Sequence, residues 1–378
     1  MTAPIPPVIA TIDTSIAVIA SPPERDHLLF LDGLRGLAAL YIVFYHATGA
    51  YNWRTPSDPP PLWTLPFRYS GFAVAIFIVL SGFVLMLPVV KYNGLRNGVK
   101  EFFFRRAKRI LPPYYVALIV SIPISSLALH TYFTKGNVLM HFLLLHNMKT
   151  EWNMTINGVM WSVATEWQIY FVFALILVPI WRKFGLTASV ISAFAIGLIP
   201  HYLLPVSHNL DWAHPWFLGL FALGMVAAVA YRRRTNYFPN PYTVLLFTAV
   251  CIVSVCFWSA QSGMQTSQWT WLIETLIGVA TAVSILACCQ PNAVKPIVNF
   301  LQHPALLKLG AFSYSLYLFH QPILSLFAQI LRRLPISFNT FMILMVTVSI
   351  PVSMAISYLF YLLVEKQFTT HPKSFSTS

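Results

Sequence analysis

The chain has 378 residues, of which 57% are hydrophobic and only 9% are charged, with a mean hydropathy of +0.67. A soluble domain carries roughly a quarter charged residues, so this composition excludes a water-facing surface and predicts a protein of the lipid bilayer. The formal charge of +13 reports orientation in a membrane before it reports ligands, and nucleic acid is not implied as a partner.

Apolar segments long enough to cross about 30 Å of hydrocarbon recur along the whole chain. They lie at residues 35–52, 71–90, 113–131, 161–180, 185–204, 214–231, 243–260, 270–289, 309–331 and 340–363. This pattern predicts an all-α fold, a polytopic membrane bundle of about ten transmembrane helices.

One membrane-embedded domain is predicted over residues 28–368, because no loop is long enough to form a separate domain. Residues 1–27 and 369–378 are expected to form flexible N-terminal and C-terminal tails. Pro6, Pro7 and Asp13 interrupt the first apolar stretch, which also lacks a basic leader, so it does not resemble a signal peptide.

The distribution of basic residues predicts the orientation of the bundle. If both termini are cytoplasmic, 18 of the 24 lysines and arginines lie on the cytoplasmic side, seven of them between Lys91 and Arg109. Positive charge accumulates in cytoplasmic loops, so we predict cytoplasmic termini and a multi-pass protein of the plasma (cytoplasmic) membrane. The pair Arg332 and Arg333 falls on the outer side and is the one discordant loop.

The first predicted span carries two ionisable side chains, Arg35 near its start and His46 near its end. Eleven helical residues turn through about 1100°, close to three full turns, and rise about 16 Å, so the two side chains share a face without touching. A long ligand could contact both, with an anionic end at the guanidinium and a reactive end at the imidazole, a common general base. A hydrogen-bonded packing role for His46 stays open.

A basic cluster precedes the third predicted span. The loop predicted over residues 91–112 ends with Arg105, Arg106 and Arg109, just ahead of a pair of prolines that indicates a break. Forked guanidinium donors suit phosphate recognition. The alternative is a positive anchor at the cytoplasmic surface of the membrane.

The fourth span places Ser162, Glu166 and Tyr170 at successive i+4 positions on one helix face. A carboxylate inside a bilayer is energetically unfavourable and therefore indicates function. Glu166 could orient a catalytic imidazole, position an acceptor hydroxyl, or pair with a buried cation; we favour catalytic support.

The ninth span holds Ser315, Tyr317 and His320 ahead of Pro322. Tyr317 and His320 lie one turn apart and predict a polar wall in the bundle. Alternatively, His320 bonds backbone carbonyls that the proline leaves without a donor.

The four cysteines, Cys251, Cys256, Cys288 and Cys289, lack the spacing of a zinc site or of a disulfide framework. We interpret them as free thiols within the membrane. No metal site and no permanently bound cofactor is expected.

Several short motifs occur in a characteristic order. They are Asp32-Gly33-Leu34-Arg35-Gly36 with His46, Phe77 to Phe83, Arg106 to Pro112, Trp161-Ser162 with Glu166, Phe217 to Gly224, Ser313 to Tyr317 with His320, and Glu365-Lys366. In order and spacing they resemble the acyltransferase-3 family of membrane O-acyltransferases, whose members acetylate surface polysaccharides, lipopolysaccharide O-antigens and related glycoconjugates. The resemblance covers Leu31 to Phe368.

The resemblance implies a ten-helix bundle that uses cytoplasmic acyl-CoA, often acetyl-CoA, as co-substrate. It also implies essential roles for Arg35 and His46 and important roles for Arg106 and Arg109. Gln367 stands where the family usually has a proline, which leaves the chemistry untouched. Many bacterial relatives append a soluble esterase-like domain after the bundle. Because this chain stops at Ser378, we expect acceptor delivery to use the membrane domain or another protein.

We therefore predict an O-acyltransferase that moves an acyl group from acyl-CoA to a hydroxyl of a carbohydrate or glycosylated acceptor. His46 would be the general base, and Glu166 would support it. Arg35, joined by Arg105, Arg106 and Arg109, would bind acyl-CoA. The expected contacts to the acceptor or to the developing oxyanion are Tyr317, His320, Ser162 and Ser315.

Three alternatives remain open at this point. The first is a transporter or flippase, since interior Arg, His and Glu also describe a substrate pathway, although no inverted repeat is visible. The second is a covalent acyl-enzyme at Ser81, Ser162 or Ser315, none of which lies in a Gly-x-Ser-x-Gly motif. The third is a membrane scaffold without catalytic activity.

Overall fold

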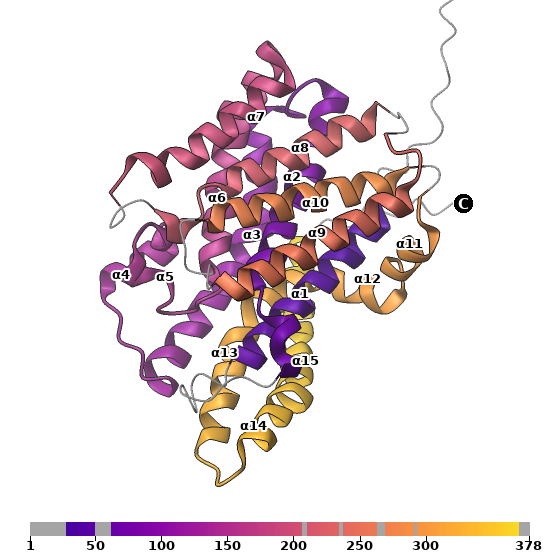
Figure 1. Ribbon diagram of the computed structural model, residues 1–378. Coiled ribbons are helices and arrows are strands. Elements are labelled where there is room, and N and C mark those ends of the chain that lie inside the picture. The colour runs from indigo at the N-terminus through magenta and orange to yellow at the C-terminus, as the bar shows by residue number, and fades with distance from the viewer. Residues whose placement is uncertain are drawn as a thin grey trace, which may run out of the picture.

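The computed structural model describes residues 28–49, 62–205, 210–233, 237–262, 269–290 and 293–369. The two predicted tails, apart from residue 369, lie outside these residues. Helices dominate the described residues, which contain no strand, in agreement with the predicted all-α class (Figure 1).

The helices follow one another with short connections. In chain order they are α1 (Leu29–Gly49), α2 (Ser70–Tyr92), α3 (Gly98–Pro123), α4 (Lys135–Phe142), α5 (Thr150–Asn153), α6 (Met160–Val172), α7 (Val178–Leu203), α8 (Phe217–Arg232), α9 (Pro241–Ser262), α10 (Thr270–Cys289), α11 (Lys295–Leu301), α12 (Pro304–Ala311), α13 (Ser313–Arg332), α14 (Phe338–Leu344), α15 (Ile350–Phe360) and α16 (Lys366–Phe368). Turns of π-helix join α6 to α7, α14 to α15 and α15 to α16.

Seven helices in the described part of the chain are long and apolar enough to cross a membrane. They are Leu29–Gly49, Trp63–Tyr92, Gly98–Ala128, Met160–Leu203, Asp211–Arg232, Thr270–Cys289 and Phe338–Phe368. The chain is thus a multi-pass membrane protein, whereas the predicted count of about ten stays a prediction.

Three features explain why fewer helices meet this criterion than were predicted. The run from Met160 to Leu203 has 44 residues, and Gly185 interrupts it with a non-helical backbone (φ 86°), so it contains two of the predicted spans. In α9 only Pro241–Cys256 is described with its side chains, and this part is too short for the criterion. The polar residues of α13 lower its hydropathy.

The predicted loop over residues 91–112 is wrong, because α3 begins at Gly98 and continues through both prolines. The basic segment is amphipathic: Phe102 and Ile110 are buried, whereas Lys108 and Arg109 are exposed. A helix face that buries apolar side chains outweighs the local preference of this sequence for a loop. Proline inside a membrane helix is tolerated where neighbouring helices support the backbone.

Helix α8 lies at the centre of the bundle, with buried residues on every side and contacts to α2, α7 and α10. Its most extensive contacts are with α2. A Cβ atom at Gly82 would lie 2.0 Å from the Phe221 carbonyl oxygen, and one at Gly224 would lie 2.1 Å from the Val79 carbonyl oxygen. Small residues therefore allow the two backbones to touch.

Gly224→Ala should destabilise the bundle by about 1–3 kcal/mol, because α2 and α8 must separate to admit the methyl group. The midpoint of thermal unfolding of the purified protein in detergent measures the effect. Gly49→Ala is the matched control, since a Cβ there would have no atom within 4 Å. Equal midpoints for both variants would contradict this packing.

The segment between α3 and α6 contains a buried histidine pair. The rings of His141 and His146 stack with centroids 3.8 Å apart, and both side chains are fully buried. Burial lowers the pKa of His141 to about 4 and that of His146 to about 2. Both rings are neutral in the folded protein at neutral pH.

These shifts predict that acid weakens the fold. In the unfolded chain each histidine takes up a proton near its ordinary pKa of about 6.5, but in the folded protein neither does so until the pH is much lower. Stability is therefore complete above pH ~6.5 and falls by up to ~1.4 kcal/mol per histidine per pH unit between pH ~6 and ~5. Thermal unfolding across this range should show a steeper loss in the wild type than in His146→Phe; parallel losses would refute the assignment.

Candidate active site

A cavity of about 130 Å³ lies among α1, α2, α3, α6 and α13. Its cationic lining residues are Arg35, Arg106 and Arg109. Arg109 is exposed and stands where the cavity opens, whereas Tyr317 is buried at its inner end. The cavity therefore extends from the surface of the bundle into its interior.

The lining of this cavity is strongly cationic. Arg35 forms an ion pair with Asp32 at 3.1 Å, one helical turn earlier on α1. Neither Arg106 nor Arg109 has a carboxylate within ion-pair distance in the described part of the chain. Glu166 is the one carboxylate among the lining residues. Unbalanced positive charge in a partly desolvated cavity favours an anionic ligand.

Arg105, the fourth predicted donor-binding arginine, does not line the cavity. Its guanidinium lies 3.4 Å from Glu101 and donates to the Arg96 carbonyl oxygen at 3.3 Å. The structure thus brings three of the four predicted arginines together.

Helix α6 presents Ser162, Glu166 and Tyr170 to the cavity, as the i+4 spacing predicts. The Tyr170 hydroxyl donates to Glu166 Oε1 at 2.6 Å and lies 3.3 Å from Ser81 Oγ. Ser162 Oγ is 2.6 Å from the Tyr317 hydroxyl on α13. These bonds fix the polar groups at the inner end of the cavity.

His46 is not among the lining residues of this cavity but pairs with His320. His320 Nδ1 lies 2.9 Å from the Leu316 carbonyl oxygen, which can only accept, so His320 Nε2 retains its lone pair in the neutral ring. His46 Nδ1 lies 3.0 Å from the Ile42 carbonyl oxygen and 3.1 Å from His320 Nε2, so it donates to both. We assign the lone pair of His46 to Nε2, the form that a general base requires.

Tyr317 connects this histidine pair to the cavity. Its ring centroid lies 5.9 Å from that of His320, and its hydroxyl bonds Ser162. The carbonyl that Pro322 leaves without a backbone donor is that of Leu318, and Asn157 Nδ2 donates to it at 2.9 Å. His320 therefore does not replace the hydrogen bond that is lost at Pro322, although it does bond the Leu316 carbonyl oxygen.

Ser315 lies outside the cavity and donates its hydroxyl and its backbone N–H to the Glu365 carboxylate. Glu365 thereby satisfies a donor in the first turn of α13, where the helix dipole favours negative charge. Sequence reasoning assigned no role to Glu365, although the Glu365-Lys366 motif was its signal.

A second cavity, of about 220 Å³, shares Arg35 and Val84 with the first. Its further lining includes Lys91, Arg96 and Arg232, which come from the ends of α2 and α8 and from the α2–α3 connection. These residues contributed to the predicted cytoplasmic charge, but nothing in the sequence placed them together.

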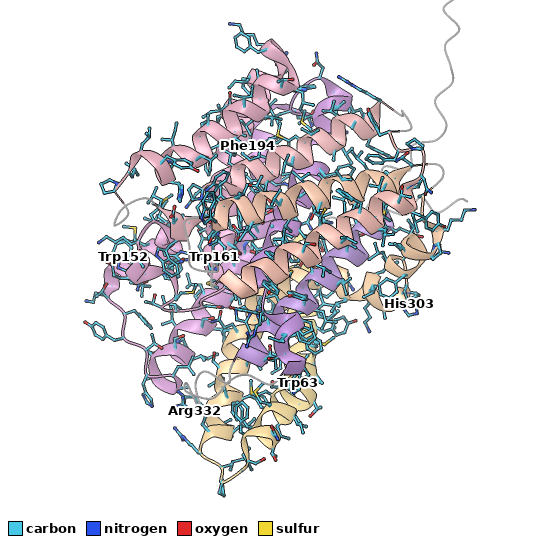
Figure 2. The ribbon with its side chains drawn as sticks, in the orientation of Figure 1. Trp63, Trp152, Trp161, Phe194, His303 and Arg332 are labelled. Carbon is cyan, nitrogen blue, oxygen red and sulfur yellow. The ribbon has the colours of Figure 1, made fainter. Side chains whose placement is uncertain are left out.

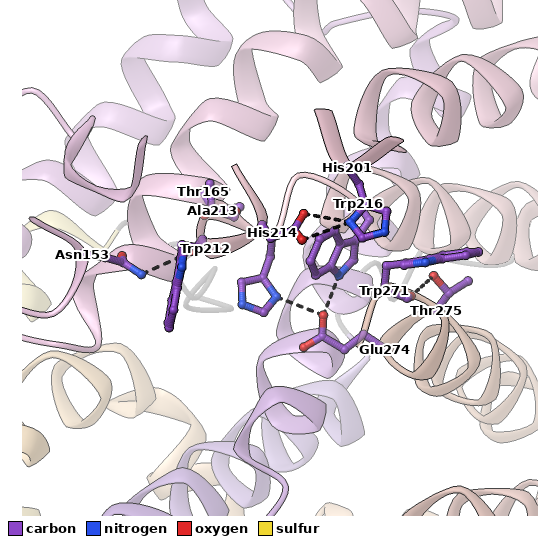
Figure 3. A network of polar contacts seen from close by, with 11 residues as sticks. Asn153, Thr165, His201, Trp212, Ala213, His214, Trp216, Trp271, Glu274 and Thr275 are labelled. Atoms are coloured by element: carbon purple, nitrogen blue, oxygen red, sulfur yellow. Dashed lines mark hydrogen bonds and ion pairs between the residues drawn. The ribbon is translucent and has the colours of Figure 1, made fainter. Parts of the chain in front are cut away.

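A polar network at the start of α8 was also missed. The buried Glu274 carboxylate accepts from His214 Nδ1 at 3.0 Å and from Trp216 Nε1 at 2.6 Å (Figure 3). His214 stacks on Trp161, with ring centroids 4.5 Å apart. Because Trp161 precedes Ser162, this network holds the start of α6 against α8 and α10.

Comparison with known proteins agrees with this geometry. A family model described as an acyltransferase domain matches residues 28–362, nearly the whole described part of the chain. The chain belongs to the acyltransferase-3 family. It is accordingly an O-acyltransferase.

Relatives of this acyltransferase share its sequence at low identity. Nodulation protein 10 of Rhizobium leguminosarum is 26% identical over 76% of the chain and 81% of the relative. A peptidoglycan O-acetyltransferase of Listeria monocytogenes is 24% identical over 82% of the chain and 51% of the relative. The acyltransferase chain thus spans about half the length of the Listeria protein. No solved structure matches it significantly.

Proposed function

We propose that this acyltransferase moves an acetyl group from acetyl-CoA to a hydroxyl of a carbohydrate or glycoconjugate. The observation that carries the proposal is the convergence of Arg35, Arg106 and Arg109 on one cavity with a single carboxylate. The phosphates of acyl-CoA supply the anion that such a cavity favours. The relatives named as O-acetyltransferases support a carbohydrate acceptor.

The two adjoining cavities suggest how the donor binds. The phosphates would span the second cavity, where they would meet Lys91, Arg96 and Arg232, and the mouth of the first, where they would meet Arg106 and Arg109. The pantetheine arm would pass Arg35 further into the cavity of about 130 Å³. The thioester would then lie near Tyr317 and Ser162. Arg35, shared by both cavities, would hold the donor where it turns inward.

The chemical step assigned to this site is direct transfer. The acceptor oxygen attacks the thioester carbonyl carbon while its proton moves to His46 Nε2, and the C–S bond breaks to release CoA as thiolate. The thiolate takes up the proton from the His46 imidazolium, which returns the base to its neutral form. His320 and the Ile42 carbonyl orient the imidazole by bonding Nδ1. The Tyr317 hydroxyl would stabilise charge on the carbonyl oxygen.

The contacts of the other candidate groups favour this assignment. Glu166 bonds Tyr170 rather than His46, so we place its supporting role beside the arginines and the donor. Ser81 and Ser162 bond tyrosines, and neither contacts a histidine in the described part of the chain, which disfavours a covalent acyl-enzyme.

The proposal includes ten membrane crossings with both termini cytoplasmic, in the plasma membrane. This topology places the basic segment from Lys91 to Arg109 in the cytoplasm, where acyl-CoA is made. It also places the far end of α13 on the outer side.

Mass spectrometry of surface glycans and lipid-linked glycans tests the function. Cells that express the protein should contain a glycan heavier by one acetyl group, which is absent without the protein and absent with His46→Ala. Identical glycans in all three strains would refute the proposal.

A further inference from the structure

The cavity of about 130 Å³ lined by Arg35, Arg106 and Arg109 is called the arginine cavity below. A third cavity, of about 340 Å³, lies at the opposite half of α13 and is called the outer cavity. It is bounded by residues 125–131, which follow α3, by residues 154–158 and by α13 from Gln321 to Arg332. The start of α13 follows α12, and its far end is at Arg332; Figure 2 shows His303, which precedes α12, and Arg332 at well-separated edges of the bundle. The cavity therefore lies toward the end of the bundle that our topology places outside.

The chemistry of this outer cavity differs from that of the arginine cavity. Its polar lining consists mainly of uncharged hydroxyl and amide groups, among them Thr155, Asn157, Gln321, Ser325 and Gln329. Arg332 is its one charged lining residue and is exposed at the edge. Hydroxyl and amide groups match the hydroxyls of a neutral ligand rather than a phosphate or an acyl chain.

One polar atom in this lining lacks a partner. Gln321 Oε1 is buried without a hydrogen bond in the described part of the chain. Its amide packs against Gly158, where a Cβ would lie 2.8 Å from Gln321 Nε2 and 3.1 Å from Oε1. A buried carbonyl oxygen without a donor is unfavourable, so this position suits a ligand hydroxyl.

The outer cavity adjoins the histidine pair along one helix. Tyr317 lines the arginine cavity, and Gln321, one turn later on α13, lines the outer cavity. His320, which bonds His46, lies between them in sequence. This part of α13 is held in place by Asn157, which lines the outer cavity and donates to the Leu318 carbonyl oxygen.

We propose that the outer cavity is the acceptor subsite and binds a neutral carbohydrate through Gln321 and Ser325. The inference rests on the proposed acyl transfer. The carbohydrate enters from the outer end of α13 and presents one hydroxyl to His46, while acetyl-CoA approaches from the arginine cavity. The two substrates thus meet at the level of Tyr317 and His320.

The test uses the full-length protein in nanodiscs with acetyl-CoA as donor and chitobiose or cellobiose as acceptor probes. Gln321→Met and Ser325→Ala should each raise the KM for the acceptor about 3- to 10-fold, as expected for one lost neutral hydrogen bond. The KM for acetyl-CoA and the thermal midpoint should stay unchanged. Gln302→Met, on the connection between α11 and α12, is the matched control and should change neither KM.

Two results would overturn the subsite. One is an unchanged acceptor KM in both variants, and the other is a donor KM that rises in step with the acceptor KM. If the wild type releases no CoA with either probe, the proposed acyl transfer itself fails, and the subsite fails with it.

Discussion

Replacing His46 with alanine should lower the rate of acyl transfer about 10²- to 10⁴-fold, the range that general base catalysis contributes. The affinity for acetyl-CoA should change little, because the arginine cavity does not include His46 among its lining residues. Single-turnover transfer from radiolabelled acetyl-CoA measures the chemical step apart from binding. Added imidazole should restore part of the rate, since it supplies a base to the vacated position.

The control for this experiment is His303→Asn, which replaces an exposed histidine at the start of α12 with another good helix cap. It should transfer at the rate of the wild type. A His46→Ala variant that is folded and retains wild-type turnover would show that another group accepts the proton.

Replacing Arg106 with alanine should raise the KM for acetyl-CoA about 10- to 100-fold, the effect of losing a hydrogen bond between charged groups. Arg109→Ala should behave similarly, and the lysine variants should lose less, because an ammonium keeps the charge but not the forked donors. Steady-state kinetics at saturating acceptor measure this change.

Arg105→Ala provides the matched control. Arg105 precedes Arg106 on the same helix, but its guanidinium bonds Glu101 and the Arg96 carbonyl rather than lining the cavity. Its donor KM should stay within about twofold of the wild type, as for a surface ion pair. Equal effects of Arg105→Ala and Arg106→Ala would indicate a general loss of positive charge and not a specific donor site.

Sequence periodicity predicted the contacts that lie within one helix. Ser162, Glu166 and Tyr170 share a face of α6 because i+4 spacing sets their direction regardless of neighbours. Arg35 lies near the start of its helix, as the position of the first apolar segment predicted. Family motifs then indicated which of these helical faces to expect in the active site.

Contacts between helices could not be predicted in this way. His46 and His320 are 274 positions apart, and Ser315 and Glu365 are 50 apart, so each contact depends on how whole helices pack. The boundary of α3 was missed because a buried apolar face outweighs local proline and charge signals. The unpartnered Gln321 oxygen depends on its packing against Gly158, which no spacing rule contains.

The most direct test of the account measures acetyl-CoA consumption and saccharide movement together in proteoliposomes. With donor supplied on the side of Lys91 to Arg109 and chitobiose on the other side, we expect one CoA released for each acetylated saccharide, with the saccharide staying where it was added. Movement of unmodified chitobiose across the bilayer, without CoA release, would contradict the account and support a transporter.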